Sequence, residues 1–228
     1  MKALNIPVGI SNFEKIRNNG FYYVDKTGLI EELLKTEAEV TLITRPRRFG
    51  KTLGMSMLES FFDIRKNSRK LFEGLEIARQ SELCSKWMNQ YPTVSVSFRQ
   101  VDGLNFTSAY DMLTMVFADL YNKHLYLLED SHVTEFQKKT FTNIAHGCGS
   151  EKEVKSSLVL LTTMMQQHYG KAVVLLIDEY DVPVAKANAH GYYNEMLDVM
   201  KGLLQALKDN QALCFAAVSY THLRAHET

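Results

Sequence analysis

The sequence predicts an α/β fold in which a mostly parallel sheet is flanked by helices on both faces. Short apolar runs rich in β-branched residues alternate with longer segments whose apolar residues recur at helical spacing. The clearest run covers residues 173–177, with the sequence VVLLI, and is apolar at every position. A parallel strand that is buried on both of its faces has this composition, so we expect one doubly wound sheet.

The individual elements follow from their residue patterns. Ser11 and Glu14 fit a capping box for a first helix, and Gly20 fits its C-terminal cap. Residues 21–27 are expected to form a turn or short strand, and the polar segment 128–150 an exposed hairpin or insertion. We expect strands within 39–44, 91–98, 171–178 and 212–219, and helices within 11–20, 28–37, 51–64, 108–128, 153–170 and 192–210.

Composition places the chain among ordinary globular proteins. Of its 228 residues, 46% are hydrophobic, and 26 basic side chains balance 26 acidic ones. A net charge near zero excludes a global field that would draw the protein onto nucleic acid or an anionic membrane. The three cysteines show no metal-ligand spacing, and neither a signal peptide nor a membrane-spanning run is evident. A protein of the reducing cytoplasm, without a membrane partner, is therefore expected.

A phosphate-binding loop is predicted between the strand at 39–44 and the helix that follows it. The sequence there is TRPRRFGKT, residues 44–52. A loop in this place points backbone N–H groups and a helix N-terminus at phosphates. Gly50 allows a close backbone approach, Lys51 can reach the β- and γ-phosphates, and Thr52 offers a hydroxyl to Mg²⁺. The alternative is a helix N-terminus that only carries solvated basic residues.

The loop departs from the usual pattern at its first position, where Arg45 replaces a glycine. Arg45 precedes Pro46, so its backbone is restricted toward extended geometry and proline stiffens the loop entrance. Arg47 and Arg48 add two guanidinium groups, each able to contact phosphate or an acidic neighbour. With Phe49, these arginines complete the predicted nucleotide-binding segment.

An acidic pair follows the apolar run at 173–177. Asp178 would lie at the carboxyl end of that strand, beside Thr52, and hold Mg²⁺ directly or through water. Glu179 would orient and polarise the water that attacks the γ-phosphate, which makes Glu179 and Lys51 the candidate catalytic residues. The alternative is a strand that runs into an acidic surface turn. That alternative is less common where a phosphate-loop motif precedes the pair in the expected order.

Several motifs together resemble the AAA-ATPase-like family of bacterial proteins. They include YVDKT at 23–27, RPRRFGKT at 45–52 and DEYDVP at 178–183, and the resemblance extends to about Ala217. It implies that arginine at the first loop position is the family's own form of the loop. It also implies that ATP is the nucleotide, since no guanine-reading motif is evident.

The same resemblance covers residues whose chemistry is less clear. Asp25, Lys26 and Thr27 match the N-terminal signature, without a firm role. Two interpretations are open: these residues fasten the N-terminal helices near the nucleotide, or Asp25 simply makes a turn and a helix cap. Asp181 and Pro183 also match the family and are expected to form a turn.

We predict a P-loop NTPase fold of the additional-strand type, with the strand at 212–218 inserted between the loop strand and the acidic strand. The predicted divisions are a helical signature segment at 1–36, an ATPase core at 37–218 and a tail at 219–228. The tail shows no strand or helix periodicity and is similar to translated sequencing-adapter read-through, so it is expected to be non-native. Ser219 lies where a polar sensor would end the last strand, but it adjoins this tail and is given no role.

The resemblance also bears on what lies outside these residues. The final strand of the sheet and any helical lid are expected to be missing. Family members usually continue into a C-terminal region resembling the PD-(D/E)XK nuclease fold. No such region is present in this sequence, so nuclease activity is not assigned to these residues.

The predicted function is Mg-dependent binding and hydrolysis of ATP. Neither an arginine finger nor a γ-phosphate sensor can be identified, and a nucleic-acid partner and the oligomeric state are not predicted. Three alternatives remain open. They are a nucleotide-operated switch with little hydrolysis that gates a fused or partner effector, a small-molecule or nucleotide kinase, and an interaction scaffold that only retains the fold.

Overall fold

The computed structural model describes residues 5–46 and 49–221 of the chain. Its centre is a sheet of four strands in the order β1-β4-β3-β2, all pairs of which are parallel. The strands are β1 (Val40–Arg45), β2 (Thr93–Ser97), β3 (Val173–Asp178) and β4 (Leu213–Thr221). The predicted α/β class is therefore confirmed, and β4 lies between β1 and β3 as the sequence suggested.

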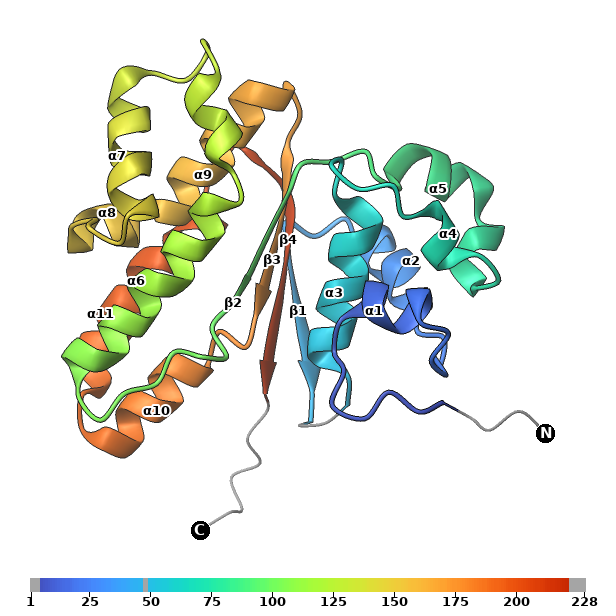
Figure 1. Cartoon of the computed structure of the whole chain (residues 1–228), viewed down its shortest axis with the longest axis horizontal. Coiled ribbons are helices and arrows are strands. Elements are labelled where there is room, and N and C mark those ends of the chain that lie inside the picture. Colours follow the sequence, from blue (N-terminus) through green and yellow to red (C-terminus); the bar gives the residue numbers. More distant parts are fainter. Residues whose placement is uncertain (1–4, 47–48, 222–228) are drawn as a thin grey trace.

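Helices cover both faces of this sheet (Figure 1). One flank carries the helices that precede β2 in the chain, and the other carries those that follow it. The first flank contains α1 (Phe13–Asn18), α2 (Gly28–Lys35), α3 (Lys51–Phe62), α4 (Arg69–Phe72), the short 3₁₀ helix η1 (Glu76–Arg79) and α5 (Ser81–Trp87). The second flank contains α6 (Phe106–Asn122), η2 (Leu125–Glu129), α7 (Glu135–Ala145), α8 (Glu151–Lys155), α9 (Ser157–Tyr169), α10 (Val182–His190), α11 (Tyr193–Leu204) and η3 (Gln205–Leu207).

Strand β3 shows why the sheet needs both layers. All six of its residues are buried. Val174 and Leu176 belong to the apolar core under α3, whereas Val173, Leu175 and Ile177 belong to the core under α6 and α9. Alternate residues of a strand point to opposite faces, so an uninterrupted apolar run is stable only between two covering layers.

Helix α1 corrects one prediction and confirms another. The N-cap is Asn12, whose side chain accepts a hydrogen bond from the Lys15 N–H, so the capping box predicted for Ser11 and Glu14 is wrong. Asparagine is at least as good a cap as serine, and it lies one residue nearer the buried Phe13. Gly20 does follow the helix with φ 63°, as the predicted C-terminal cap.

The prediction for residues 128–150 is wrong, because α7 lies within them. Thr134 and Gln137 form a reciprocal capping box at its start. Phe141 and Ile144 are buried against the second flank, so the helix is part of the core rather than an exposed hairpin. The polar residues that suggested a loop occupy the outer face of an amphipathic helix.

Two further differences concern helix ends. The predicted helix at 153–170 is divided at Ser156 into α8 and α9, and Gly170 follows α9 with φ 62°. Asp181 and Pro183 do more than form a turn: Asp181 is the N-cap position of α10, and Pro183 lies in its first turn. Proline is favoured there because the first helical N–H groups have no partner inside the helix.

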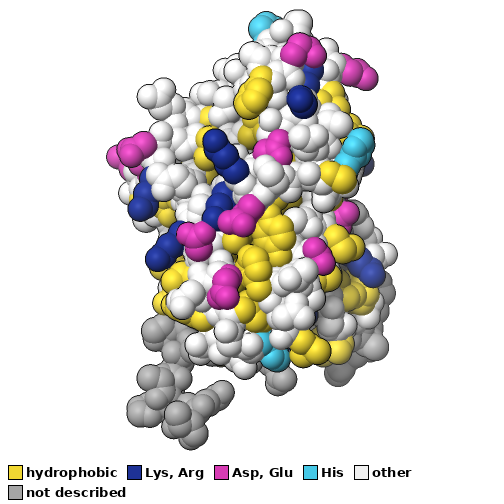
Figure 2. All heavy atoms as spheres, turned by 90° about the vertical axis from the view of Figure 1, so that its left-hand side faces the viewer, with side chains coloured by type: hydrophobic (Ala, Val, Ile, Leu, Met, Phe, Trp, Pro, Cys, Tyr) yellow, Lys and Arg dark blue, Asp and Glu magenta, His cyan; other side chains and the backbone are white. Residues whose placement is uncertain are grey.

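The outer surface of the second flank carries acidic and basic side chains side by side (Figure 2). No large area of a single sign is visible on that face, in agreement with the balanced composition. Within residues 5–46 and 49–221, no helix has both the length and the apolar character that crossing a bilayer requires.

Candidate functional site

A cavity of about 840 Å³ opens at the carboxyl ends of the strands. It lies where the loop after β1, the residues after β2 and the residues after β3 meet, with α10 and the N-terminal segment at its borders (Figure 1). In open parallel sheets, ligands bind in the crevice at this edge. The lining residues are Gly9, Ile10, Ser11, Gly50, Lys51, Thr52, Leu53, Arg99, Glu179, Asp181, Val182, Ala185 and Lys186.

The start of α3 supplies the predicted phosphate-binding side of this cavity. Gly50 is the N-cap position of the helix and has φ 74°, a left-handed conformation that strongly favours glycine. Lys51 is buried, Thr52 is half-buried, and both line the cavity. The first N–H groups of α3 have no side-chain cap, which leaves the helix terminus able to bind an anion.

The other residues of the predicted loop fare differently. Phe49 has a side chain that is 59% exposed, and it does not line the cavity. Arg47 and Arg48 lie outside the described residues, so their predicted phosphate contacts stay predictions. Of the segment 47–52, the structure thus brings Gly50, Lys51 and Thr52 to the cavity.

Asp178 ends β3 and is buried, with a relative exposure of 4%. Its Oδ1 atom accepts a short hydrogen bond from the Ser219 hydroxyl on β4. Among the described residues, no hydrogen-bond donor reaches its Oδ2 atom, although that atom is also buried. Such an orphan acceptor is rare in folded proteins, and a bound water or ion is a common reason for one.

Glu179 follows Asp178 with an unusual backbone. Its φ is 53°, in the left-handed region that non-glycine residues seldom adopt, and its N–H donates to the Ser219 hydroxyl at 3.1 Å. Residues held in this way cluster at functional sites. Burial and the charge of Asp178 raise the pKa of Glu179 above its ordinary value, while Arg99 and Lys51 oppose that rise.

The oxygen atoms at this edge are of the kind that Mg²⁺ prefers, although Asp178 is not among the residues that line the cavity. The buried orphan oxygen of Asp178 is one hard donor, and the Thr52 hydroxyl on the neighbouring helix start is a second. No group of three or more His, Cys, Asp or Glu residues in the described part of the chain could form a complete metal cage. Few protein ligands suit Mg²⁺, which usually keeps several waters and binds substrate phosphates.

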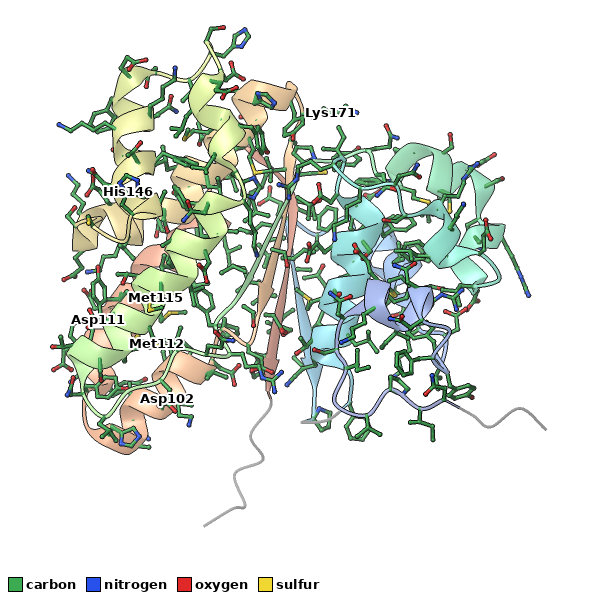
Figure 3. The ribbon with its side chains drawn as sticks, viewed as in Figure 1. Asp102, Asp111, Met112, Met115, His146 and Lys171 are labelled. Atoms are coloured by element: carbon green, nitrogen blue, oxygen red, sulfur yellow. The ribbon has the colours of Figure 1, made fainter. Side chains whose placement is uncertain are left out.

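Two basic residues of the cavity were not singled out in the sequence. Arg99 follows β2 by two residues, and Lys186 projects from α10, where it forms an ion pair with Asp102 at 2.7 Å. Figure 3 shows Asp102 toward the lower edge of the molecule, the edge at which the strands end. The signal for Arg99 was available: carboxyl ends of parallel strands meet at one edge, and Ser97 of β2 pairs with Asp178 in register.

The comparisons with known proteins agree with this arrangement. A family model described as predicted AAA-ATPase matches residues 7–221. The chain belongs to this family. The chain is also 27% identical, over 214 residues, to a curated protein of Azotobacter chroococcum mcd 1 described as an uncharacterized protein in the vnfD 5′ region. That match covers 93% of the chain but only 36% of the relative, so the chain spans about a third of the relative's length. No solved structure matches the chain.

The last strand bears on the predicted tail. Strand β4 runs to Thr221, three residues past the predicted boundary at 218. The family match also ends at residue 221. Ser219, which received no role from sequence, contacts both Asp178 and Glu179. Residues 222–228 lie outside the described residues, and the division of the chain at 36 and 218 stays a prediction.

Proposed function

We propose that this predicted AAA-ATPase binds ATP with Mg²⁺ and hydrolyses it to ADP and inorganic phosphate. The observation that carries the proposal is the carboxylate of Asp178, which ends β3 beside a cavity lined by Lys51, Thr52 and Glu179. Its buried Oδ2 atom accepts no hydrogen bond from the described residues. A purely structural aspartate would be expected to satisfy both of its oxygens. A P-loop NTPase fold of the additional-strand type is part of the same proposal.

Each residue has a distinct task in this proposal. Gly50 and the α3 N-terminus cradle the phosphates, and Lys51 binds their terminal oxygens. Thr52 and Asp178 would hold Mg²⁺, which when bound neutralises charge on the β- and γ-phosphates. Glu179 accepts a hydrogen bond from a water and aligns it with the γ-phosphorus, and its raised pKa brings its basicity closer to neutral pH.

The central test compares Glu179→Gln with the wild-type chain. The glutamine keeps the shape of the side chain but cannot act as a base, so we expect phosphate release to fall by about a hundredfold or more while ATP stays bound. Glu195→Gln, on the exposed face of α11, is the matched control and should turn over normally. Unchanged turnover in Glu179→Gln would refute the role of Glu179.

The same assay separates the alternatives. Phosphate release in buffer, without an added acceptor, distinguishes hydrolysis from a kinase. ATP binding with negligible turnover in the wild-type chain would favour the nucleotide-operated switch. A melting temperature that ATP and Mg²⁺ do not raise would favour the scaffold, because a ligand that binds only the folded state must stabilise it.

A further inference from the structure

The backbone around Lys26 is held by a short hydrogen-bond system. Asp25 Oδ1 accepts hydrogen bonds from the Thr27 N–H at 2.9 Å and the Thr27 hydroxyl at 2.7 Å, and Asp25 Oδ2 accepts one from the Glu76 N–H at 2.7 Å. The Thr27 hydroxyl accepts another from the Ile77 N–H at 3.2 Å, and Thr27 is fully buried. The residues on both sides of Lys26 are therefore fixed to η1.

The Lys26 side chain extends from this fixed backbone to the start of α3. A methyl group built on Gly50 would lie 3.6 Å from Lys26 Nζ, so the ammonium group lies close to the left-handed N-cap of the helix. The Lys26 side chain is exposed. Across residues 5–46 and 49–221, no ion pair joins it to a carboxylate.

Two lysines, Lys26 and Lys51, lie at the positively polarised N-terminus of α3. The N-terminus of a helix carries about half an elementary charge, and cations are unfavourable beside it. The first turn of α3 contains no acidic residue, and Lys51 is its first residue. An anion bound at the helix terminus would attract each of these positive groups, since ammonium groups and helix N–H groups both bind phosphate oxygens.

We propose that Lys26 is a second phosphate-binding lysine, which donates to the phosphate chain of the nucleotide held at the start of α3. The inference rests on the proposed function and adds a binding residue to its site. Asp25 and Thr27 are positioning residues that hold the backbone of Lys26 in place. The N-terminal signature motif thereby becomes part of the nucleotide site. Asp25 makes the predicted turn with Thr27, but the predicted helix cap at Asp25 is wrong, because Thr27 is the N-cap position of α2 and makes no side-chain cap hydrogen bond.

Isothermal titration calorimetry on the full 228-residue chain tests this assignment. The ligands are ATP and inorganic tripolyphosphate, each with Mg²⁺, and the variants are Lys26→Met, Lys26→Arg, Lys51→Met and Lys70→Met. Lys70→Met is the matched control, because Lys70 is an exposed lysine on α4, far along the chain from the cavity residues. Thermal melting without ligand should be unchanged in Lys26→Met, since the exposed side chain takes no part in the hydrogen bonds to η1.

We expect Lys26→Met to weaken both ligands by about tenfold or more, because a charge-assisted hydrogen bond to phosphate is lost. The factor should be the same for ATP and tripolyphosphate, since Lys26 recognises phosphate and not the base. Lys26→Arg should retain most of the affinity, and Lys70→Met should stay within about twofold of wild type.

Failure of this inference is distinguishable from failure of the proposed function. If the wild-type chain binds neither ligand, both are overturned. If the wild type binds and Lys51→Met does not, while Lys26→Met behaves like Lys70→Met, the Lys26 assignment alone is overturned. A loss of ATP binding without a loss of tripolyphosphate binding also overturns it, because Lys26 would then contact the base or sugar.

Discussion

Two buried aspartates, one at each end of the sheet, are hydrogen-bonded in different ways. At the amino end, buried Asp63 accepts three hydrogen bonds from Arg65 through both of its oxygens, and Arg65 also donates to the Lys123 carbonyl at 3.3 Å. His124 continues this network, with its Nδ1 atom 3.2 Å from the Tyr126 hydroxyl. At the carboxyl end, Asp178 is also buried, but its Oδ2 atom accepts no hydrogen bond from any residue that the structure describes.

The comparison teaches how to separate a structural carboxylate from a functional one. Burial alone does not distinguish Asp63 from Asp178, since both are almost fully enclosed. The difference lies in hydrogen bonding: both oxygens of Asp63 accept from Arg65, whereas the Oδ2 atom of Asp178 accepts from none of the described residues. Glu179, whose backbone is left-handed, is the residue next to Asp178.

The largest expected effect comes from Asp178→Asn. It removes the charge proposed to hold Mg²⁺, so ATP hydrolysis should fall by about a hundredfold or more. Stability should change by less than about 1 kcal/mol, because a neutral amide is cheaper to bury than a carboxylate with an unpaired oxygen. Phosphate release and denaturant unfolding measure the two quantities. Normal hydrolysis in this variant would remove the distinction between the two ends.

Asp63→Asn should show the reverse pattern. It leaves the half-buried guanidinium of Arg65 without a counter-charge, and we expect a loss of about 2 kcal/mol in unfolding free energy. ATP affinity should be unchanged, because Asp63 lies at the far end of the strands. Lys35→Met, which breaks the exposed Lys35–Glu31 pair on α2, is the control and should cost less than about 0.5 kcal/mol.

A third expected effect is a pH dependence of stability at the amino end. Burial, with Arg65 and Lys123 nearby, lowers the pKa of His124 to about 3, so the folded protein keeps this ring neutral. The unfolded chain takes up a proton near pH 6.5, and stability is therefore full above that pH and is lost as the pH falls toward 3. The slope should approach about 1.4 kcal/mol per pH unit.

Urea unfolding at intervals from pH 7.5 to pH 4.5 measures this slope. His124→Gln should reduce the slope by the contribution of about one proton taken up on unfolding. Glutamates and exposed Asp130, whose pKa is lowered to about 2, contribute toward the acidic end of this range in both proteins, so the difference in slope between wild type and variant isolates His124. An identical slope in the variant would show that the amino end is not the pH-sensitive one.

Local patterns were enough to predict much of this architecture. The apolar run before Asp178 and the Gly-Lys-Thr sequence at 50–52 gave the strands, the helix start and the insertion of β4. Helix α7 was missed because its polar residues outnumber its buried ones, although the capping residues Thr134 and Gln137 are visible in the sequence.

The rest depends on contacts between residues far apart in the sequence. The place of Arg99 after a predicted strand put it at the carboxyl edge of the sheet, but no local pattern indicates that Lys26 lies by the phosphate loop, because tertiary packing of other elements brings it there. The amino-end network is similar: Arg65 and His124 are 59 residues apart and meet only once α3 and α6 are packed on the sheet. The left-handed conformation of Glu179 is also set by its surroundings, because glutamate has no intrinsic preference for it.

The position of β4 sets the order in which the site can be assembled during synthesis. β1 and β3 have no direct pairing, and β4, the strand that joins them, is the last of these four strands to leave the ribosome. Until residues 213–221 are available, no backbone ladder fixes the distance between the glycine-lysine loop and the carboxylates. A nascent chain should therefore acquire affinity for nucleotide late and abruptly, because non-local pairing must be complete first.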